Sequence, residues 1–140
     1  MTVVEMLLAR RSEHKLEDPA PDDDLLLQLL EVAATAADHG RLRPWRMIAH
    51  RGDGRLSLGS ALAADVFEKH RDQLIAKAMR APLILTVIFT PRSSERIPAW
   101  EQLIAASGVV HLLILLLHEV GFGSIWRTGA AASCAAQNMR

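Results

Sequence analysis

The chain has 140 residues, half of them apolar, with 16 basic and 16 acidic side chains. This length fits one domain. The neutral balance gives no electrostatic reason to expect nucleic acid or an anionic membrane as the main partner. The only cysteine is Cys134, so an internal disulfide is excluded and the chain suits a reducing cytoplasm. The N-terminus has no basic stretch followed by an apolar run, so no secretory signal is predicted.

The N-terminal part of the chain is predicted to be helical. A short helix is expected over residues 3–10, followed by a polar connection over residues 12–21. Three consecutive aspartates at 22–24 favour a helix N-terminus. This second helix is expected to run to Ala37, and Gly40 is a natural residue just past its C-terminus.

The rest of the chain alternates strands with helices. A strand over residues 45–50 and a turn at 51–54 precede a helical stretch. The aliphatic and β-branched run APLILTVIFT predicts a strand covered on both faces. An exposed loop, a long apolar helix and a glycine-punctuated turn with a short strand follow. The expected ranges after the turn are 56–79 for the helical stretch, 81–90 for the strand, 91–98 for the loop, 100–120 for the apolar helix and 121–129 for the turn and strand.

The apolar helix raises the question of a membrane span. Its most apolar part, residues 103–117, would be about 22 Å long at 1.5 Å per residue, short of the roughly 30 Å of a hydrocarbon core. A helix that is apolar all round but too short to span is typical of the core of a soluble protein. The pattern therefore favours a single sheet with helices packed on it.

Familiar catalytic and metal-binding patterns are absent from the sequence. The six histidines form no HExxH pair and there is no cysteine cluster, so no metal is predicted. The chain has no GxSxG elbow, no Walker loop and no full dinucleotide fingerprint. Gly121-x-Gly123 alone is weak evidence, because a glycine pair after a helix usually serves the turn.

Three short blocks could bind a ligand, and each also has a structural interpretation. Arg10-Arg11-Ser12 offers guanidinium forks and a hydroxyl suited to phosphate, although cations at this position also complement a helix C-terminus. Residues 38–45 could meet a planar ring or form an ordinary loop; within them Arg43 is expected to be extended because proline follows. Residues 121–129 let the backbone approach a ligand and present Trp126, Arg127 and Thr128.

Taken together and in order, these blocks resemble the nitroreductase family, and particularly its compact YdjA-like branch, over residues 4–129. The matching positions are Arg10-Arg11-Ser12 with Pro19 and Pro21, Asp38-His39 of a Pro-Asp-His motif, Arg43-Pro44-Trp45 for Gln-Pro-Trp, Ala81-Pro82-Leu83, Trp100-Glu101-Gln102, and Gly121 through Gly129. The last of these motifs is the most specific.

The resemblance implies an α+β fold: a central antiparallel or mixed sheet flanked by helices, with FMN bound at a homodimer interface. Arg10, Arg11 and Ser12 would hold the phosphate and ribityl end of FMN. The other implied FMN contacts are Thr35, His39, Arg43, Trp126, Arg127 and Thr128. The resemblance also implies a nicotinamide-nucleotide contact at the end of the apolar helix, formed by Leu116, Leu117, His118, Glu119, Val120 and Gly121.

The activity implied by the resemblance is a ping-pong NAD(P)H oxidoreductase that reduces nitroaromatic, quinone or similar small acceptors. The flavin would carry the chemistry, so no protein nucleophile or base is expected. A flavin-binding or structural protein without turnover, or a different FMN reaction on the same scaffold, remain alternatives.

The sequence departs from the family pattern in three places. Ala37 replaces a proline, Arg43 replaces a glutamine, and the last eleven residues lack the family's character. The chain is therefore expected to be one nitroreductase-like domain, residues 1–140, without the family's C-terminal strand and extension. A missing strand would leave a sheet edge open.

Overall fold

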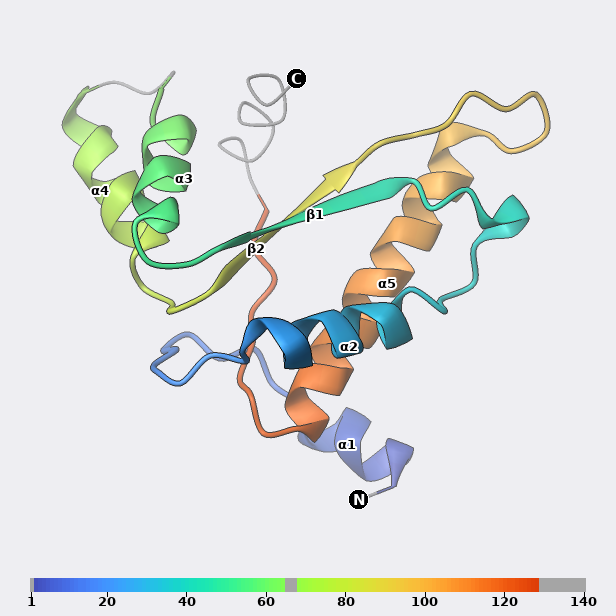
Figure 1. Ribbon diagram of the computed structural model, residues 1–140, viewed down its shortest axis with the longest axis horizontal. Helices are drawn as coiled ribbons and strands as arrows, with labels where there is room; N and C mark the ends of the chain where they lie inside the picture. Colours follow the sequence, from blue (N-terminus) through green and yellow to red (C-terminus); the bar gives the residue numbers. More distant parts are fainter. Residues whose placement is uncertain (1, 65–67, 129–140) are drawn as a thin grey trace. The chain divides into compact units, whose positions relative to one another are not determined.

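The computed structural model describes residues 2–64 and 68–128, which fall into two compact units. The first unit holds the residues up to Glu13, together with Pro21–Met47 and Val87–Ile125. The second holds His14–Ala20, Ile48–Thr86 and, of the described residues after Ile125, those at 126–128. The elements in chain order are α1 (Val3–Ala9), α2 (Asp23–Ala33), the 3₁₀ turn η1 (His39–Arg41), β1 (Trp45–His50), α3 (Gly54–Leu62), α4 (Glu68–Ala78), β2 (Ile84–Phe89) and α5 (Ala99–Glu119) (Figure 1).

The two N-terminal helices begin at side-chain caps. Thr2 and Glu5 form a reciprocal capping box at the start of α1, and the Asp22 carboxylate accepts a hydrogen bond from the Leu25 amide at 2.8 Å. The predicted end of the second helix is wrong, because α2 ends at Ala33. The Thr35 hydroxyl donates to the Val32 carbonyl at 2.8 Å, and this local bond competes with continued helix.

The core of the first unit lies between α2 and α5, which cross each other (Figure 1). From α2 it receives Leu26, Leu29 and Ala33, and from α5 mainly small side chains that let the two helices approach closely. Gly108 belongs to this stripe, since a Cβ on it would lie 3.6 Å from the Cβ of Ala36. The buried apolar residues of α5 are Ala105, Ala106, Val109, Val110 and Leu113.

Helix α5 is longer than the apolar run that the sequence suggested. Its 21 residues have a mean hydropathy of 1.8, and 28% of its most apolar window is buried. At 1.5 Å per residue it extends about 31 Å, enough to cross a hydrocarbon core. The length argument against a membrane span is therefore wrong, although the core helix of a soluble protein passes the same test of length and composition.

Strands β1 and β2 form an antiparallel pair, the sheet found in the described part of the chain. The Thr90 amide, just after β2, donates to the Pro44 carbonyl, just before β1, at 2.9 Å. All six residues of β2 are half-buried without alternation, so both faces of the strand are partly covered. The short strand expected near the C-terminus is absent from residues 122–128, where a single backbone hydrogen bond, from the Glu13 amide to the Ser124 carbonyl, stands in place of the ladder that a strand requires.

The second unit contains the pair α3 and α4 where the sequence suggested one continuous helical stretch. The two helices pack closely at Gly59, which is buried. A Cβ on Gly59 would lie 2.9 Å from the Ile75 Cα and 3.1 Å from the Ala78 Cβ. Glycine is therefore required at this contact for steric reasons.

We expect Gly59→Ala to lower the free energy of unfolding by about 1–3 kcal/mol, because the backbone of α4 must shift to admit the methyl group. This loss should appear although alanine is the better helix former by about 1 kcal/mol. Urea denaturation measures the change. Gly54→Ala is the matched control, since a Cβ there meets nothing within 4 Å; equal effects of the two substitutions would contradict the packing argument.

Candidate functional site

The first and last motifs of the sequence meet in the first unit. They line a cavity of about 310 Å³ together with the end of α5. The Glu13 amide donates to the Ser124 carbonyl at 3.0 Å and holds the two segments together. The lining residues are Arg10, Arg11, Glu13, His118, Gly121, Phe122, Gly123 and Ser124.

A specific turn at the end of α5 directs the chain into this cavity. Gly121 has φ +89°, the Phe122 amide donates to the Leu117 carbonyl at 2.8 Å, and the Gly121 amide donates to the His118 carbonyl at 3.1 Å. This is the Schellman arrangement, in which a left-handed residue closes the helix and usually is glycine. The first glycine of the motif therefore serves the turn, and the turn positions the residues that follow it.

The two arginines of the first motif have different roles. The Arg11 Nη1 donates to the Leu8 carbonyl at 2.5 Å and to the Arg10 carbonyl at 2.9 Å, so Arg11 caps the C-terminal end of α1 as the structural interpretation suggested. No hydrogen bond of the Arg10 guanidinium is present within the described chain. Arg10 is half-buried and lines the cavity, so its donors are available to a ligand. Ser12 is exposed and does not line the cavity.

His118 lines this cavity and contains an unused polar atom. Its Nε2 is buried and has no hydrogen-bond partner among the residues that the structure describes. Leu116 and Leu117, which were also predicted to contact the nucleotide, help to close the end of α5. Their carbonyls accept hydrogen bonds from the Val120 and Phe122 amides. Among residues 116–121, only His118 and Gly121 line the cavity.

The Asp-His motif lies at the opposite end of α5 and forms a strained loop. Gly40, Arg41 and Arg43 have φ values of +72°, +50° and +46°, a region that non-glycine residues rarely adopt. The expectation that Arg43 is extended is therefore wrong. The Asp38 carboxylate accepts a hydrogen bond from the Arg43 amide at 2.7 Å, and this bond to a charged acceptor offsets the local strain.

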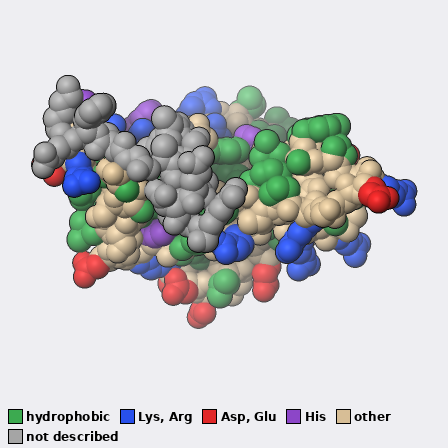
Figure 2. Space-filling view, turned by 90° about the horizontal axis from the view of Figure 1, so that it is seen from above, with side chains coloured by type: hydrophobic (Ala, Val, Ile, Leu, Met, Phe, Trp, Pro, Cys, Tyr) green, Lys and Arg blue, Asp and Glu red, His purple; other side chains and the backbone are tan. Residues whose placement is uncertain are grey.

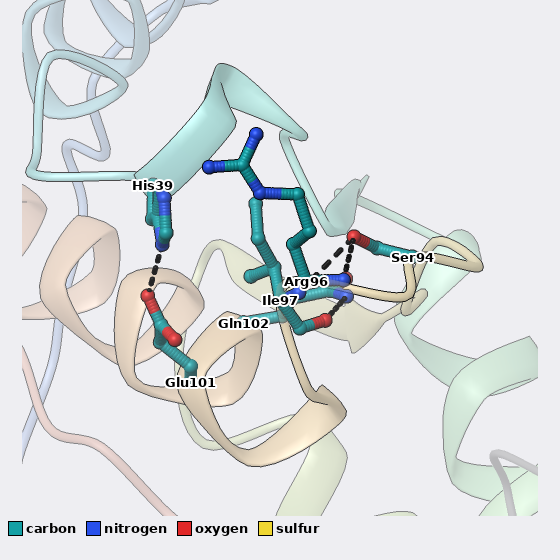
Figure 3. Close-up of polar contacts among 6 residues, drawn as sticks. All are labelled: His39, Ser94, Arg96, Ile97, Glu101 and Gln102. Atoms are coloured by element: carbon teal, nitrogen blue, oxygen red, sulfur yellow. Dashed lines mark hydrogen bonds and ion pairs between the residues drawn. The ribbon is translucent and has the colours of Figure 1, made fainter.

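His39 joins this loop to α5 (Figure 3). Its Nδ1 lies 2.6 Å from the Glu101 Oε1, so the Asp-His motif and the Trp-Glu-Gln motif meet in space. The side chain of His39 is 56% exposed and that of Glu101 32% exposed, which makes this a surface ion pair of small energetic value.

Gln102, next to Glu101, fixes the loop before α5 (Figure 3). Its side chain is 2% exposed. It accepts from the Arg92 amide at 2.8 Å and donates to the Arg92 and Ile97 carbonyls at 2.9 and 3.0 Å. Ile97 in turn lies against Gly40, where a Cβ would come within 2.8 Å of the Ile97 Cδ1. One buried amide therefore sets the position of both loops at this end of the unit.

The predicted FMN-binding residues do not form a single cluster in the first unit. Glu101 and His118 are 17 positions apart on α5, about 26 Å along a helix that rises 1.5 Å per residue. Arg10 and Arg11 lie at the far end of α5, and His39 lies at the near end. Thr35 is exposed and its hydroxyl is bonded to the Val32 carbonyl. Trp126, Arg127 and Thr128 are exposed residues of the second unit.

Sequence reasoning missed Glu13 as part of the cavity, and it placed residues 122–124 in a segment that approaches a ligand without naming them as individual contacts. The adjacency of Glu13 to the Arg-Arg-Ser motif was an available signal, but no pattern indicates that it pairs with Ser124. A second cavity of about 450 Å³, in the second unit, is lined by His14, Lys15, Leu16, Glu17 and Arg80. It holds none of the predicted site residues, and we do not assign it a role. Within the described residues no three His, Cys, Asp or Glu side chains are grouped to hold a metal ion.

Comparison with known proteins identifies the chain's relatives. The model of the nitroreductase family matches residues 7–139. The Escherichia coli (strain K12) protein named "Putative NAD(P)H nitroreductase YdjA" is 34% identical over 135 residues, covering 93% of this chain and 74% of that protein. The chain therefore belongs to the nitroreductase family, as the ordered motifs indicated.

Solved structures show the same fold. A nitroreductase-like family protein from Bacillus cereus superimposes with a TM-score of 0.83 at 24% identity, covering 99% of this chain and 77% of that one. A nitroreductase from Desulfovibrio desulfuricans, solved in complex with FMN, gives a TM-score of 0.72 at 23% identity, covering 96% of this chain and 72% of that one. The predicted α+β fold is confirmed.

We expect Gln102→Leu to lower the free energy of unfolding by about 2 kcal/mol or more, because it leaves one amide and two carbonyls without partners. Urea denaturation measures this loss, and amide hydrogen exchange should become faster at Arg92. Gln28→Leu, on the exposed side of α2, is the matched control and should change stability by no more than about 0.5 kcal/mol. Equal stability of the two variants would show that the loop is held by other contacts.

Proposed function

We propose that the protein is an FMN-dependent NAD(P)H oxidoreductase that reduces nitroaromatic, quinone or similar small acceptors in a ping-pong reaction. Membership in the nitroreductase family supports the class of reaction. The observation that carries the proposal is the cavity at the end of α5, where, among the described residues, the His118 Nε2 is buried without a partner and the half-buried Arg10 guanidinium has no hydrogen bond. Native proteins rarely leave such groups unpaired unless a ligand or water meets them.

The donors of this cavity fit the phosphate end of FMN. Arg10 offers a guanidinium fork that matches phosphate oxygens, and the glycines beside Phe122 let a ligand come close to the backbone. Bound FMN would supply the hydride-accepting and hydride-donating chemistry. Trp126, Arg127 and Thr128 follow the cavity-lining segment directly in the chain, and we propose them as further FMN contacts. We likewise propose that residues 116–121 contact NAD(P)H.

We further propose that the active form is a homodimer. His39 and Arg10 lie near opposite ends of α5, and the roughly 26 Å between those ends exceeds the length of an extended FMN. Two copies with antiparallel α5 helices would bring the cavity of one copy to the η1 turn of the other. Each FMN would then contact Arg10 from one copy and the Asp38-His39 loop from the other.

Exposed apolar side chains support this assembly. Leu8 of α1 is 69% exposed, and Ile104 of α5 is 62% exposed. Trp100, Leu103 and Val4 are also exposed. Figure 2 shows that, on the face seen from above, further apolar side chains reach the surface beside lysine and arginine. Large exposed apolar patches mark interaction sites. We place the dimer in the cytoplasm because the single cysteine suits a reducing compartment.

The purified chain should take up FMN, turn yellow and sediment as a dimer. Its visible flavin absorbance should bleach with NADH or NADPH under anaerobic conditions and return when a nitroaromatic or quinone is added. Initial rates at varied concentrations of both substrates should give parallel double-reciprocal lines. Heat-denatured protein with the same free FMN is the control for reduction in solution.

Three outcomes would overturn parts of this proposal. A chain that stays colourless after incubation with FMN is not a flavoprotein. A yellow chain that does not bleach with either nucleotide is the flavin-binding protein without turnover, and one that bleaches but reduces neither acceptor class carries out a different FMN reaction.

Arg10→Ala should weaken FMN binding by about tenfold to a hundredfold, because a hydrogen bond to a charged group contributes about 1.5–3 kcal/mol. Riboflavin binding should be unchanged, since riboflavin lacks the phosphate. Titration of flavin fluorescence measures both affinities. Arg11→Ala removes the cap of α1 and should mainly lower the free energy of unfolding. It should weaken FMN binding less than Arg10→Ala does. An Arg10→Ala variant that loses riboflavin and FMN affinity equally would contradict the assignment of Arg10 to the phosphate.

A further inference from the structure

The end of α5 contains a polar group whose presence the fold does not explain. His118 lies in the last turn of the helix, and its Nε2 is buried without a hydrogen-bond partner among the described residues. Leaving a buried donor or acceptor unpaired destabilises a fold, because the group loses its hydrogen bonds to water. An apolar side chain of similar size at this position would avoid that cost and continue the leucine-rich run before it. The imidazole is therefore better explained by a ligand than by packing.

The surroundings of His118 define the chemistry of that ligand. The same cavity presents Arg10, whose guanidinium has no partner in the described chain, and Arg11, whose Nη1 caps α1. Glu13 also lines the cavity and partly offsets their charge. Two arginines outnumber one glutamate, so the cavity favours an anion that presents several acceptor oxygens.

The imidazole can reach such an anion without a change of the backbone. The side-chain torsion that orients a histidine ring is broad and roughly two-fold, and His118 already lines the cavity. The Schellman turn holds the helix end in place through the His118 and Leu117 carbonyls, so the ring can turn while the chain stays fixed. Its Nε2–H would then donate into the cavity beside Arg10.

We propose that His118 is a further phosphoryl-binding residue, donating a hydrogen bond from Nε2 to a phosphate oxygen held beside Arg10. The inference rests on the proposed function for the identity of the natural ligand. Two sources share the chemistry: the monophosphate of FMN, and the diphosphate of the nicotinamide nucleotide. Inorganic phosphate carries the same oxygens and tests His118 whether or not flavin binds.

The first test compares ligands with and without phosphate. His118→Leu removes the donor, and His118→Gln retains an N–H donor. If FMN is the source, His118→Leu should weaken FMN about tenfold or more, leave riboflavin within about twofold, and be largely restored in His118→Gln. If the nicotinamide nucleotide is the source, FMN affinity is kept, while KM for NAD(P)H rises with little change in kcat. His70→Leu, at an exposed position on α4, is the matched control.

The second test is measured on the unmutated chain and uses a variant only to assign the signal. In the unmutated chain labelled with ¹⁵N-histidine, the His118 Nε2 resonance should shift on titration with inorganic phosphate and remain unmoved by chloride at equal ionic strength. His118→Gln identifies the resonance by its loss. No shift with phosphate, FMN or NAD(P)H would overturn the inference, as would equal losses of FMN and riboflavin affinity in His118→Leu.

These results separate the inference from the proposed function. A wild-type chain that takes up no FMN contradicts the flavoenzyme, while the phosphate titration still decides the role of His118. A wild-type chain that binds FMN and turns over, with a His118 resonance that responds to no phosphoryl ligand, contradicts the inference alone.

Discussion

The packing of α5 against α2 is the contact on which the rest of the first unit depends. The face of α5 that meets α2 is made mostly of alanine, valine and glycine, so the two helices approach closely and bury Leu26 and Leu29 between them. A helix fixed in this way is a rigid rod about 31 Å long. Each end of the rod carries one part of the candidate site, and neither part is placed without it.

The two ends are held by different kinds of bond. At the N-terminal end, the buried Gln102 side chain bonds the loop at Arg92 and Ile97, and Ile97 lies against Gly40. At the C-terminal end, Gly121 closes the helix in a left-handed conformation and one backbone bond joins Ser124 to Glu13. Backbone and amide bonds thus hold both ends in place, and within the described part of the chain the Arg10 guanidinium and the His118 Nε2 take no part in those bonds. This division is expected of a flavoenzyme, where the cofactor carries the chemistry and the protein positions it.

Sequence reasoning was most successful where a local pattern has a local cause. The helix over α5 and the strand over β1 follow from apolar periodicity, and the start of α2 follows from the cap at Asp22. It failed where a non-local bond outweighs local preference. Arg43 precedes a proline and should be extended. Instead, its amide donates a hydrogen bond to the Asp38 carboxylate, and the Arg43 backbone adopts a left-handed conformation. The α2 helix ends early because the Thr35 hydroxyl donates a hydrogen bond to the Val32 carbonyl. The amino-acid composition of this segment does not predict that bond.

The sequence by itself determined the family, because membership depends on the order of several short motifs and not on their positions in space. It also indicated which residue types could hold a phosphate. Only the tertiary structure decided that Arg11 caps α1 while Arg10 has no hydrogen-bond partner among the described residues, although the two arginines are adjacent and identical in type. Likewise, the resemblance gave His118 as one of six neighbouring nucleotide contacts, and the fold distinguished it by a buried nitrogen that is unpaired within the described part of the chain. The physical reason is that hydrogen-bond satisfaction is a property of surroundings, and residues distant in sequence supply those surroundings.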